Sequence, residues 1–431
     1  MSIGTRNVMM AILILTGILV GGPGRARPAG DTRSGEGPTG RQLDPYVAYL
    51  RQHARPPLDF VIEKIGAYDL IVFDDAWHSC AEPFEFYQRL IRTPEFHRQV
   101  KYVFIEVLPI NKQPCVDAYL RSRPEDATLL YPAFQDDLGG SGWAPRSYFD
   151  LLHAIWEVNQ GLAEDERIRV VAVNAACYWP EIATAEDVAL FRRSLLGNDY
   201  TMYRVIVDEM AGFDGAHKGI FLTNTRHAYK GIRDQQGRLY WNVGTFLHQR
   251  HPGKTYSIRF HNMALSIESE RPRDEAVPET TSGMERVVFN WIRMGDGLWD
   301  SAFETMGNEP MAFSLEENVF GAHPYVGNLM LNVAPGQTMS DANDAIIFLA
   351  PLEDLHNTAT SSNIYTPEFK RELARRYGIL YTQPQLASLM EEAGVTTLEA
   401  LVDSDCAPRP RRPIPQAQSL PPKDAWRDGE D

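Results

Sequence analysis

Hydrophobic residues along the chain form short continuous runs that alternate with amphipathic segments. The runs are typical of β-strands buried on both faces, and they occupy residues 68–73, 101–105, 168–173, 219–222 and 255–260. Between them apolar residues recur every three or four positions, which predicts helices at residues 83–92, 147–162, 185–196, 200–210 and 241–249. This alternation predicts an α/β fold, with a mostly parallel central sheet and helices on both of its faces.

The C-terminal third has a less regular pattern. Residues 286–289 and 345–349 predict further strands, and residues 366–403 predict terminal helices. The stretch between the two strands is longer than an ordinary connection, which favours a functional loop. Two of its segments are expected to form a lid or a pocket rim: residues 299–303 with 306–307, and residues 321–333. We therefore expect helical and irregular additions to the sheet in this part of the chain.

The two ends of the chain differ from its middle. Arg6 precedes an apolar run at residues 8–20, and Gly21 and Gly22 follow it. This order is typical of a secretory signal peptide, and the run is shorter than the roughly 20 residues of a membrane-spanning helix. We predict a signal peptide and hence a periplasmic or secreted protein, or alternatively a retained N-terminal anchor that would bring the protein to a membrane. The expected order is signal peptide 1–29, disordered leader 30–44, α/β domain 45–405 and disordered Pro-rich tail 406–431.

Charge and cysteine content narrow the class of partner. The formal net charge is -15, and an acidic chain repels phosphate backbones, so we expect no nucleic-acid partner. We expect a small-molecule substrate instead. The chain has 4 cysteines and no CxxC spacing, which argues against a zinc ribbon or a redox motif. An oxidising compartment permits a disulfide, but the sequence does not assign the pair.

Polar residues stand where the predicted strands end. Ligands of open parallel sheets bind outside the carboxyl ends of the strands, so we expect these residues to share one pocket. They are Asp74, Asp75 and His78 after the first strand, Glu106 at the end of the second, Asn174 after the third, Asn224, Arg226 and His227 after the fourth, and His261 and Asn262 after the fifth. His261 is equally compatible with a surface position, and it is left out of the predicted site.

These segments resemble a known superfamily. Residues 75–78, which follow a strand and precede a helix, are similar to the GExxH segment of erythromycin esterase-like proteins. Residues 101–106 look like the next strand of that family, which ends in a Glu. Residues 219–227 resemble its strand that ends in an Asn/His cluster, and residues 242–260 resemble its helix and following strand. The chain therefore resembles the erythromycin esterase-like, ChaN and Tiki superfamily, as a divergent member nearest to the erythromycin esterase-like proteins.

The chain departs from the family pattern at several positions. Asp74 and Asp75 replace the family's Gly-Glu pair, and Ser79 replaces the Gly after the histidine. Thr223 stands near the place of the first histidine of the Asn/His cluster. These changes argue against erythromycin itself as the substrate. The resemblance implies a hydrolase that acts on an ester, lactone or amide bond of a small organic molecule.

Without a metal, His78 is the expected general base, because imidazole titrates near neutral pH. Asp75 or Glu106 would orient it, and His227 with Arg226 would polarise the carbonyl group or hold the oxyanion. We expect the substrate to contact the side chains of Asp74, Trp77, Asn174, Asn224, Tyr178 and Trp179. The three aromatic residues among these would form an aromatic wall together with Trp143, although ordinary core packing is the better explanation for any one of them taken alone.

Two alternatives remain open from the sequence. No cofactor is required, but Asp75, His78, Glu106 and His227 are also a ligand set for a divalent metal. Tiki-like relatives are metal-dependent peptidases, and ChaN-like relatives bind haem. The chain could accordingly be a non-catalytic periplasmic binder of haem, a metal complex or a small ligand on the same scaffold. Structural alternatives also exist, in which His78 caps a helix and Glu106 pairs with Arg226.

Overall fold

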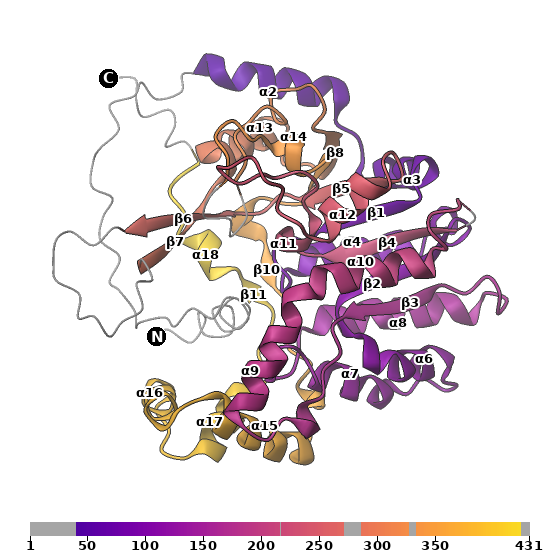
Figure 1. The fold of residues 1–431 in the computed structure, drawn as a ribbon. Helices are drawn as coiled ribbons and strands as arrows, with labels where there is room; N and C mark the ends of the chain where they lie inside the picture. The colour runs from indigo at the N-terminus through magenta and orange to yellow at the C-terminus, as the bar shows by residue number, and fades with distance from the viewer. Residues whose placement is uncertain (1–39, 216, 271–285, 327–332, 424–431) are drawn as a thin grey trace. The chain divides into compact units, whose positions relative to one another are not determined.

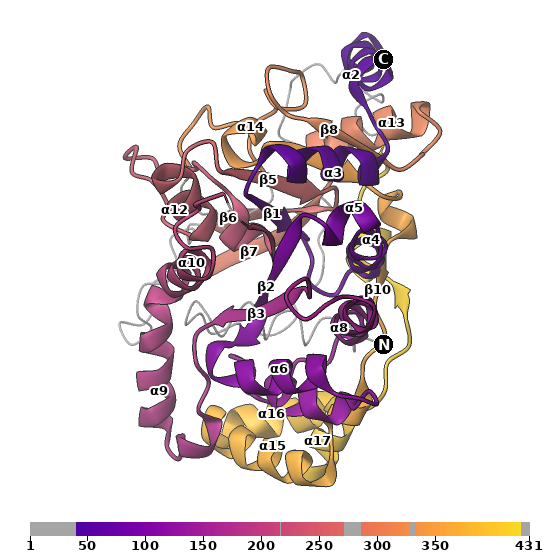
Figure 2. The same ribbon diagram turned by 90° about the vertical axis from the view of Figure 1, so that its right-hand side faces the viewer.

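The computed structural model describes residues 40–215, 217–270, 286–326 and 333–423. Figures 1 and 2 show its helices and strands from two directions. Its contacts divide the chain into two compact units, each made of segments that are distant in sequence. Of the described residues, unit 1 holds 84–219 and 357–412, and unit 2 holds 40–83, 220–356 and 413–423. The single domain predicted for residues 45–405 is thus two discontinuous compact units.

The predicted α/β fold is confirmed. Seven strands form one sheet in the order β3-β2-β4-β1-β5-β9-β8, and two further pairs, β6-β7 and β10-β11, stand apart from it. In unit 1, β2 is parallel to β3. In unit 2, β1 is parallel to β5 and β5 to β9, whereas β8 is antiparallel to β9. The strands are β1 Leu70–Asp74, β2 Val100–Pro109, β3 Arg169–Asn174, β4 Lys218–Thr223, β5 Thr255–Phe260, β6 Ala264–Glu270, β7 Arg286–Ile292, β8 Met311–Ser314, β9 Ala345–Phe348, β10 His356–Asn357 and β11 Arg412–Pro413.

The predicted helices lie close to where the hydrophobic periodicity places them, because an amphipathic segment buries its apolar face against the sheet. The structure also has helices that were not predicted, such as α2, α3 and α6. The predicted helix at 83–92, for example, is α4, and the one at 147–162 is α8. The helices are α2 Gly40–His53, α3 Pro57–Ala67, α4 Ala81–Ile91, α5 Pro94–His97, α6 Gln113–Arg121, α7 Tyr131–Gln135, α8 Arg146–Gln160, α9 Ala185–Ser194, α10 Asn198–Glu209, α11 Thr225–Ala228, α12 Val243–Arg250, α13 Leu298–Thr305, α14 Met339–Ala342, α15 Pro367–Leu380, α16 Gln383–Ala393, α17 Leu398–Asp405 and α18 Pro415–Gln418.

The predicted lid at 299–303 is wrong. These residues belong to α13, and Trp299 and Phe303 are completely buried in the core of unit 2. Phe303 stacks on Phe348 of β9 with ring centroids 4.2 Å apart. The length of this stretch could not show whether it forms a loop or a buried helix. Of the second predicted lid segment, residues 327–332 lie outside the described residues.

The predicted disordered tail is also wrong for residues 406–423. Cys406 is buried at the end of α17, and Ile414 and Ala417 are buried in unit 2. Backbone hydrogen bonds tie this segment down, for example from Ile414 N to Leu355 O at 3.0 Å. A few apolar residues anchor it because neighbouring elements provide the pocket, which composition does not reveal. The predicted leader likewise reaches into α2, which begins at Gly40.

The sequence also predicted a signal peptide and permitted a disulfide. The proposed signal peptide at 1–29 lies outside the described residues. No helix among the described residues is both long and apolar enough to cross a membrane.

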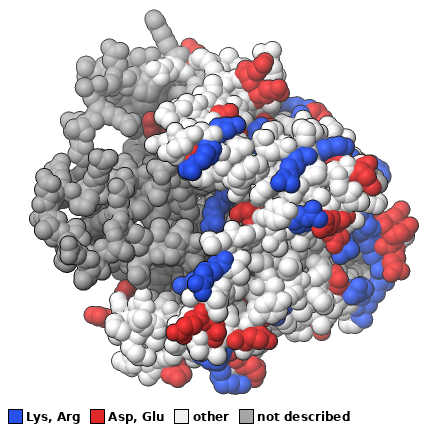
Figure 3. All heavy atoms as spheres, in the orientation of Figure 1, with Lys and Arg blue, Asp and Glu red and all other residues white. Residues whose placement is uncertain are grey.

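All four cysteines are free thiols, so none forms a disulfide. In the view of Figure 3, acidic and basic side chains are interspersed over the described surface, with no extended area of one sign.

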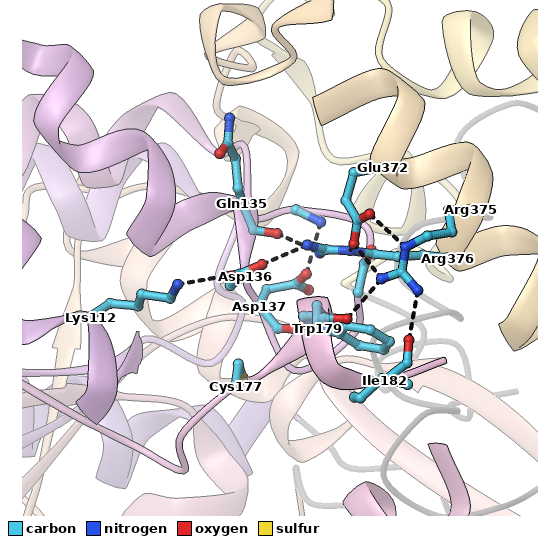
Figure 4. Close-up of polar contacts among 12 residues, drawn as sticks. Lys112, Gln135, Asp136, Asp137, Cys177, Trp179, Ile182, Glu372, Arg375 and Arg376 are labelled. Carbon is cyan, nitrogen blue, oxygen red and sulfur yellow. Dashed lines mark hydrogen bonds and ion pairs between the residues drawn. The ribbon is translucent and has the colours of Figure 1, made fainter. Parts of the chain in front are cut away.

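A buried network of ion pairs and hydrogen bonds connects α15 to the rest of unit 1 (Figure 4). The guanidinium of Arg376 on α15 donates to Asp136 Oδ1 at 2.6 Å and to Glu372 Oε1 at 2.8 Å. It also lies 5.1 Å from the ring of Trp179, as in a cation–π contact. Arg375 reaches the carbonyl oxygens of Trp179 and Ile182. Trp179 is therefore part of this internal packing.

Candidate functional site

The residues after β1 form a short chain of hydrogen bonds in unit 2. His78 Nδ1 lies 2.8 Å from Asp75 Oδ2, and His78 Nε2 lies 2.9 Å from Asn224 Nδ2. The Asp75 side chain is 3% exposed and that of His78 is 15% exposed. The structure thus brings together a carboxylate, an imidazole and an amide that the sequence had assigned to one site.

The contacts of Asn224 define the protonation pattern of His78. Asn224 Oδ1 accepts a hydrogen bond from the backbone N–H of Arg226 at 3.1 Å, which leaves the amide nitrogen facing His78. Because that nitrogen is a donor, His78 Nε2 must be the acceptor. Nδ1 then carries the proton and donates to Asp75. This tautomer, inferred from the hydrogen-bond network, is the one a general base needs, since the basic lone pair is on the nitrogen opposite the carboxylate.

The loop after β1 is shaped by its own backbone contacts. Ala76 has a positive φ of 55°, and its N–H donates to Asp74 Oδ1 at 2.8 Å. This is an Asx-turn, in which the aspartate side chain replaces a backbone acceptor. Cys80 N then bonds to Trp77 O at 2.8 Å, and α4 follows. The turn places Asp75 and His78 three residues apart on one side of the loop.

The short helix α11 carries the second part of the site. Asn224 is its N-cap, and His227 N donates to Asn224 O at 3.0 Å. His227 is buried, and Arg226 is partly buried, with its carbonyl accepting from Asn242 Nδ2 at 2.8 Å. His227 and Arg226 therefore lie on the same four-residue helix that Asn224 caps, so their position relative to the His78 partner is fixed by local structure.

Four of the other predicted site residues lie in unit 1. Glu106 is a buried residue of β2, and Asn174 ends β3, where its Oδ1 accepts from Asn198 Nδ2 at 2.7 Å. Tyr178 is 54% exposed, whereas Trp179 is 1% exposed and donates its Nε1–H to Asp137 O at 2.7 Å. The predicted role of Trp179 in an aromatic wall is wrong, because its ring is enclosed by the protein and offers no surface to a ligand.

In unit 2, Trp77 remains beside the site. It is mostly buried and meets Trp291 edge to face, with ring centroids 5.2 Å apart. The surface-facing alternative for His261 is wrong, since its side chain is completely buried and its Nε2 lies 3.1 Å from Asp300 Oδ1. The apolar core of α13 and β9 encloses this pair, which is why a histidine after a strand was not exposed.

Sequence reasoning missed two polar residues that adjoin the site. Arg259 is a buried cation within β5, and it donates to Asp74 Oδ2 at 2.8 Å. Thr225, the first residue of α11, donates to Asp74 Oδ1 at 3.0 Å. A single charged residue inside an otherwise uncharged strand was an available signal, because a buried charge requires a partner. No comparable signal marks Thr225 in the sequence.

The predicted metal set does not form a metal site. Asp75, His78, Glu106 and His227 all lie within the described ranges, and no three His, Cys, Asp or Glu side chains there are arranged to hold an ion. The hydrogen bond between His78 and Asp75 occupies one nitrogen and one oxygen of the predicted ligand set.

Cys80 lies near the site but is not a nucleophile. Burial, together with the neighbouring Glu82 carboxylate at 3.2 Å from the sulfur, raises the pKa of this thiol well above its ordinary value. The reactive form of cysteine is the thiolate, so the shift suppresses its reactivity.

We expect iodoacetamide to modify Cys115 first in the native protein, because Cys115 is partly exposed and the other three thiols are buried. Peptide mapping by mass spectrometry at increasing times measures this order. All four thiols should react once the protein is unfolded in denaturant. Modification of native Cys80 at the rate of Cys115 would contradict the described burial.

Comparisons with known proteins give matches in structure only. No known family model matches the sequence, and no curated protein is similar to it. A Bacillus cereus protein is similar in structure over 71% of this chain and 97% of its own, with a TM-score of 0.47 and 11% identity. A mutant of the erythromycin esterase EreC in its open conformation matches over 67% and 92%, with a TM-score of 0.42 and 12% identity.

Haem-bound ChaN of Campylobacter jejuni matches over 47% of this chain and 85% of its own, with a TM-score of 0.31 and 11% identity.

Proposed function

We propose that this protein is a hydrolase of a small organic ester, lactone or amide, with His78 as the general base. The observation that carries the proposal is the hydrogen-bonded series Asp75, His78 and Asn224. A carboxylate on Nδ1 holds the imidazole in one tautomer and stabilises the imidazolium that forms when Nε2 takes a proton. A base held in this way is worth roughly 10²–10⁴-fold in rate.

In this mechanism the proton is transferred to His78 Nε2, the atom that contacts the Asn224 amide. A water molecule that entered this contact would donate to Nε2 and could attack a carbonyl carbon held beside it. The Asn224 amide would then be a donor to the attacking water or to the developing oxyanion, since donors aimed at the new charge stabilise the transition state. α11 also carries Arg226 and His227, the residues predicted to polarise the carbonyl group or hold the oxyanion.

The first test is a panel of aryl esters, lactones and aryl amides with the purified wild-type protein, followed by Asp75→Asn. We expect Asp75→Asn to lower turnover by up to about 10⁴-fold, as the same change beside a catalytic histidine does elsewhere. The asparagine amide can donate to Nδ1, which favours the wrong tautomer. The initial rate of hydrolysis at saturating substrate measures the effect.

Asp69→Asn is the matched control, because Asp69 precedes β1 at the opposite end of the strand and pairs with Lys254. It should hydrolyse the same substrate at the wild-type rate. Equal rates in Asp75→Asn and the wild type would contradict the proposed mechanism. If no substrate in the panel is turned over and a ligand binds only when Asp75 and His78 are intact, the chain is a binder instead.

A further inference from the structure

Three residues that the proposed chemistry does not use form a hydrogen-bonded polar cluster next to the proposed site. The side chains of Arg259 and Asp74 are 2% and 1% exposed. Arg259 Nη1 donates to Asp74 Oδ2 at 2.8 Å and to Thr225 Oγ1 at 2.6 Å. Thr225 Oγ1 in turn donates to Asp74 Oδ1 at 3.0 Å. The hydrogen bonds therefore form a closed triangle, which we call the Asp74–Thr225–Arg259 clamp.

The clamp joins three backbone segments. Asp74 ends β1 and directly precedes the loop with Asp75 and His78, and Thr225 directly follows Asn224. Arg259 stands beside Asp74 in the parallel pairing of β1 with β5. Any shift of α11 relative to β1 would stretch the bond between Thr225 and Asp74. The clamp therefore limits the distance between the loop that carries His78 and the start of α11, where Asn224 lies.

A second observation separates this arrangement from an ordinary buried ion pair. Arg259 Nε is buried and has no hydrogen-bond partner among the described residues. A buried donor without a partner costs about 1–3 kcal/mol. Asp74 Oδ1 already accepts from Ala76 N at 2.8 Å, so the carboxylate is used for positioning the loop as well as for charge neutralisation. Local costs of this kind are expected where a protein maintains a functional geometry.

We propose that the Asp74–Thr225–Arg259 clamp positions Asn224 against His78 and thereby keeps His78 in the tautomer that a general base requires. The inference rests on the proposed function for its catalytic meaning. The positional effect itself is independent of any substrate. Asp74, Thr225 and Arg259 are positioning residues in this scheme, and they do not touch the reacting atoms.

The test compares Thr225→Val, which removes the hydroxyl at nearly constant volume, with Thr225→Ser, which keeps it. Histidine side chains labelled with ¹⁵N report their tautomers in long-range ¹⁵N–¹H spectra, and His78→Gln identifies the His78 signals among 11 histidines. We expect the wild type to show the Nδ1–H tautomer alone and Thr225→Val to show a mixture. Hydrolysis should fall roughly 10-fold to 100-fold in Thr225→Val, as expected for a misplaced reacting group.

Thr225→Ser should restore the wild-type spectrum. Thr305→Val is the matched control, because it removes another partly buried hydroxyl of unit 2, bonded to Ser301 O at 2.8 Å in α13. Arg259→Lys is a second test of the clamp, because both hydrogen bonds come from Nη1, which lies one bond farther from Cα than the ammonium nitrogen of a lysine. It should give the same tautomer mixture even if Thr225→Val does not fold.

A His78 spectrum unchanged in both Thr225→Val and Arg259→Lys would overturn the inference. If the proposed hydrolase function is wrong, the result is different. Neither the wild type nor any variant then hydrolyses the panel substrates, but the tautomer of His78 still changes in the clamp variants.

Discussion

Replacing His78 by Gln is expected to lower hydrolysis of the best panel substrate by about 10²–10⁴-fold, the usual worth of a general base. Glutamine can still bond to Asp75, but it cannot accept a proton at neutral pH. The wild-type rate should rise with pH over the range in which an imidazole loses its proton. The variant should lack this rise, because the group that titrates is gone. Initial rates from pH 5 to 9 measure both effects.

His53→Gln is the control for this experiment. His53 ends α2 as an exposed residue of unit 2 and stacks on Tyr49, with ring centroids 4.6 Å apart. Its rate and pH profile should match those of the wild type. If His78→Gln keeps the wild-type pH profile, a different group is the base. Circular dichroism of both variants separates a lost base from a lost fold.

Replacing Arg376 by Ala is expected to lower the free energy of unfolding by about 3–5 kcal/mol, the usual cost of removing one partner of a buried ion pair. The Arg376 side chain is 3% exposed and pairs with Asp136 and Glu372. Its loss leaves two carboxylates short of a donor and removes the cation from the face of Trp179. The residual pairing of Asp136 with Lys112 at 2.6 Å favours the lower part of this range. Urea denaturation measures the change.

Arg371→Ala is the matched control, since Arg371 lies on the same helix and pairs with Glu368 while both side chains are more than 70% exposed, at 72% and 74%. An exposed pair of this kind contributes about 0–1 kcal/mol. Equal losses in the two variants would show that the network of Figure 4 does not fasten α15.

The stability difference should also depend on pH. Burial raises the pKa of Glu372, but hydrogen bonds from Arg375 and Arg376 outweigh it and lower the pKa below its ordinary value. A lowered carboxyl pKa stabilises the folded state above the unfolded pKa, and that stability is lost as pH falls through the folded value. The wild type should therefore lose part of its advantage over Arg376→Ala in acid. An advantage that grew in acid would contradict this assignment.

Local patterns in the sequence were sufficient for much of the fold. The apolar run at 68–73 contains all of β1 except Asp74, and the amphipathic segment at 147–162 contains nearly all of α8. Backbone geometry sets these periods and water selects the buried face, so neither depends on distant residues. The spacing of Asp75 and His78 on one loop is equally local. The structure adds their direct hydrogen bond.

The burial of individual side chains was harder to predict from the sequence. Trp179 and Ile414 were expected to face a ligand or solvent, and both are enclosed in the core. Which neighbour covers a side chain depends on the whole fold. The covering groups of Trp179, for example, come from α15, about 200 residues later in the chain, through Arg376.

The sequence by itself determined the parallel α/β sheet and the polar residues at the ends of its strands. Only the tertiary structure decided how those residues pair. Arg259 meets Asp74 across 185 residues and Thr225 meets Asp74 across 151 residues. No local period connects positions so far apart, because their contact follows from the pairing of β1 with β5 and from the packing of α11 against β1. The partners of a buried charge are therefore a property of the assembled sheet.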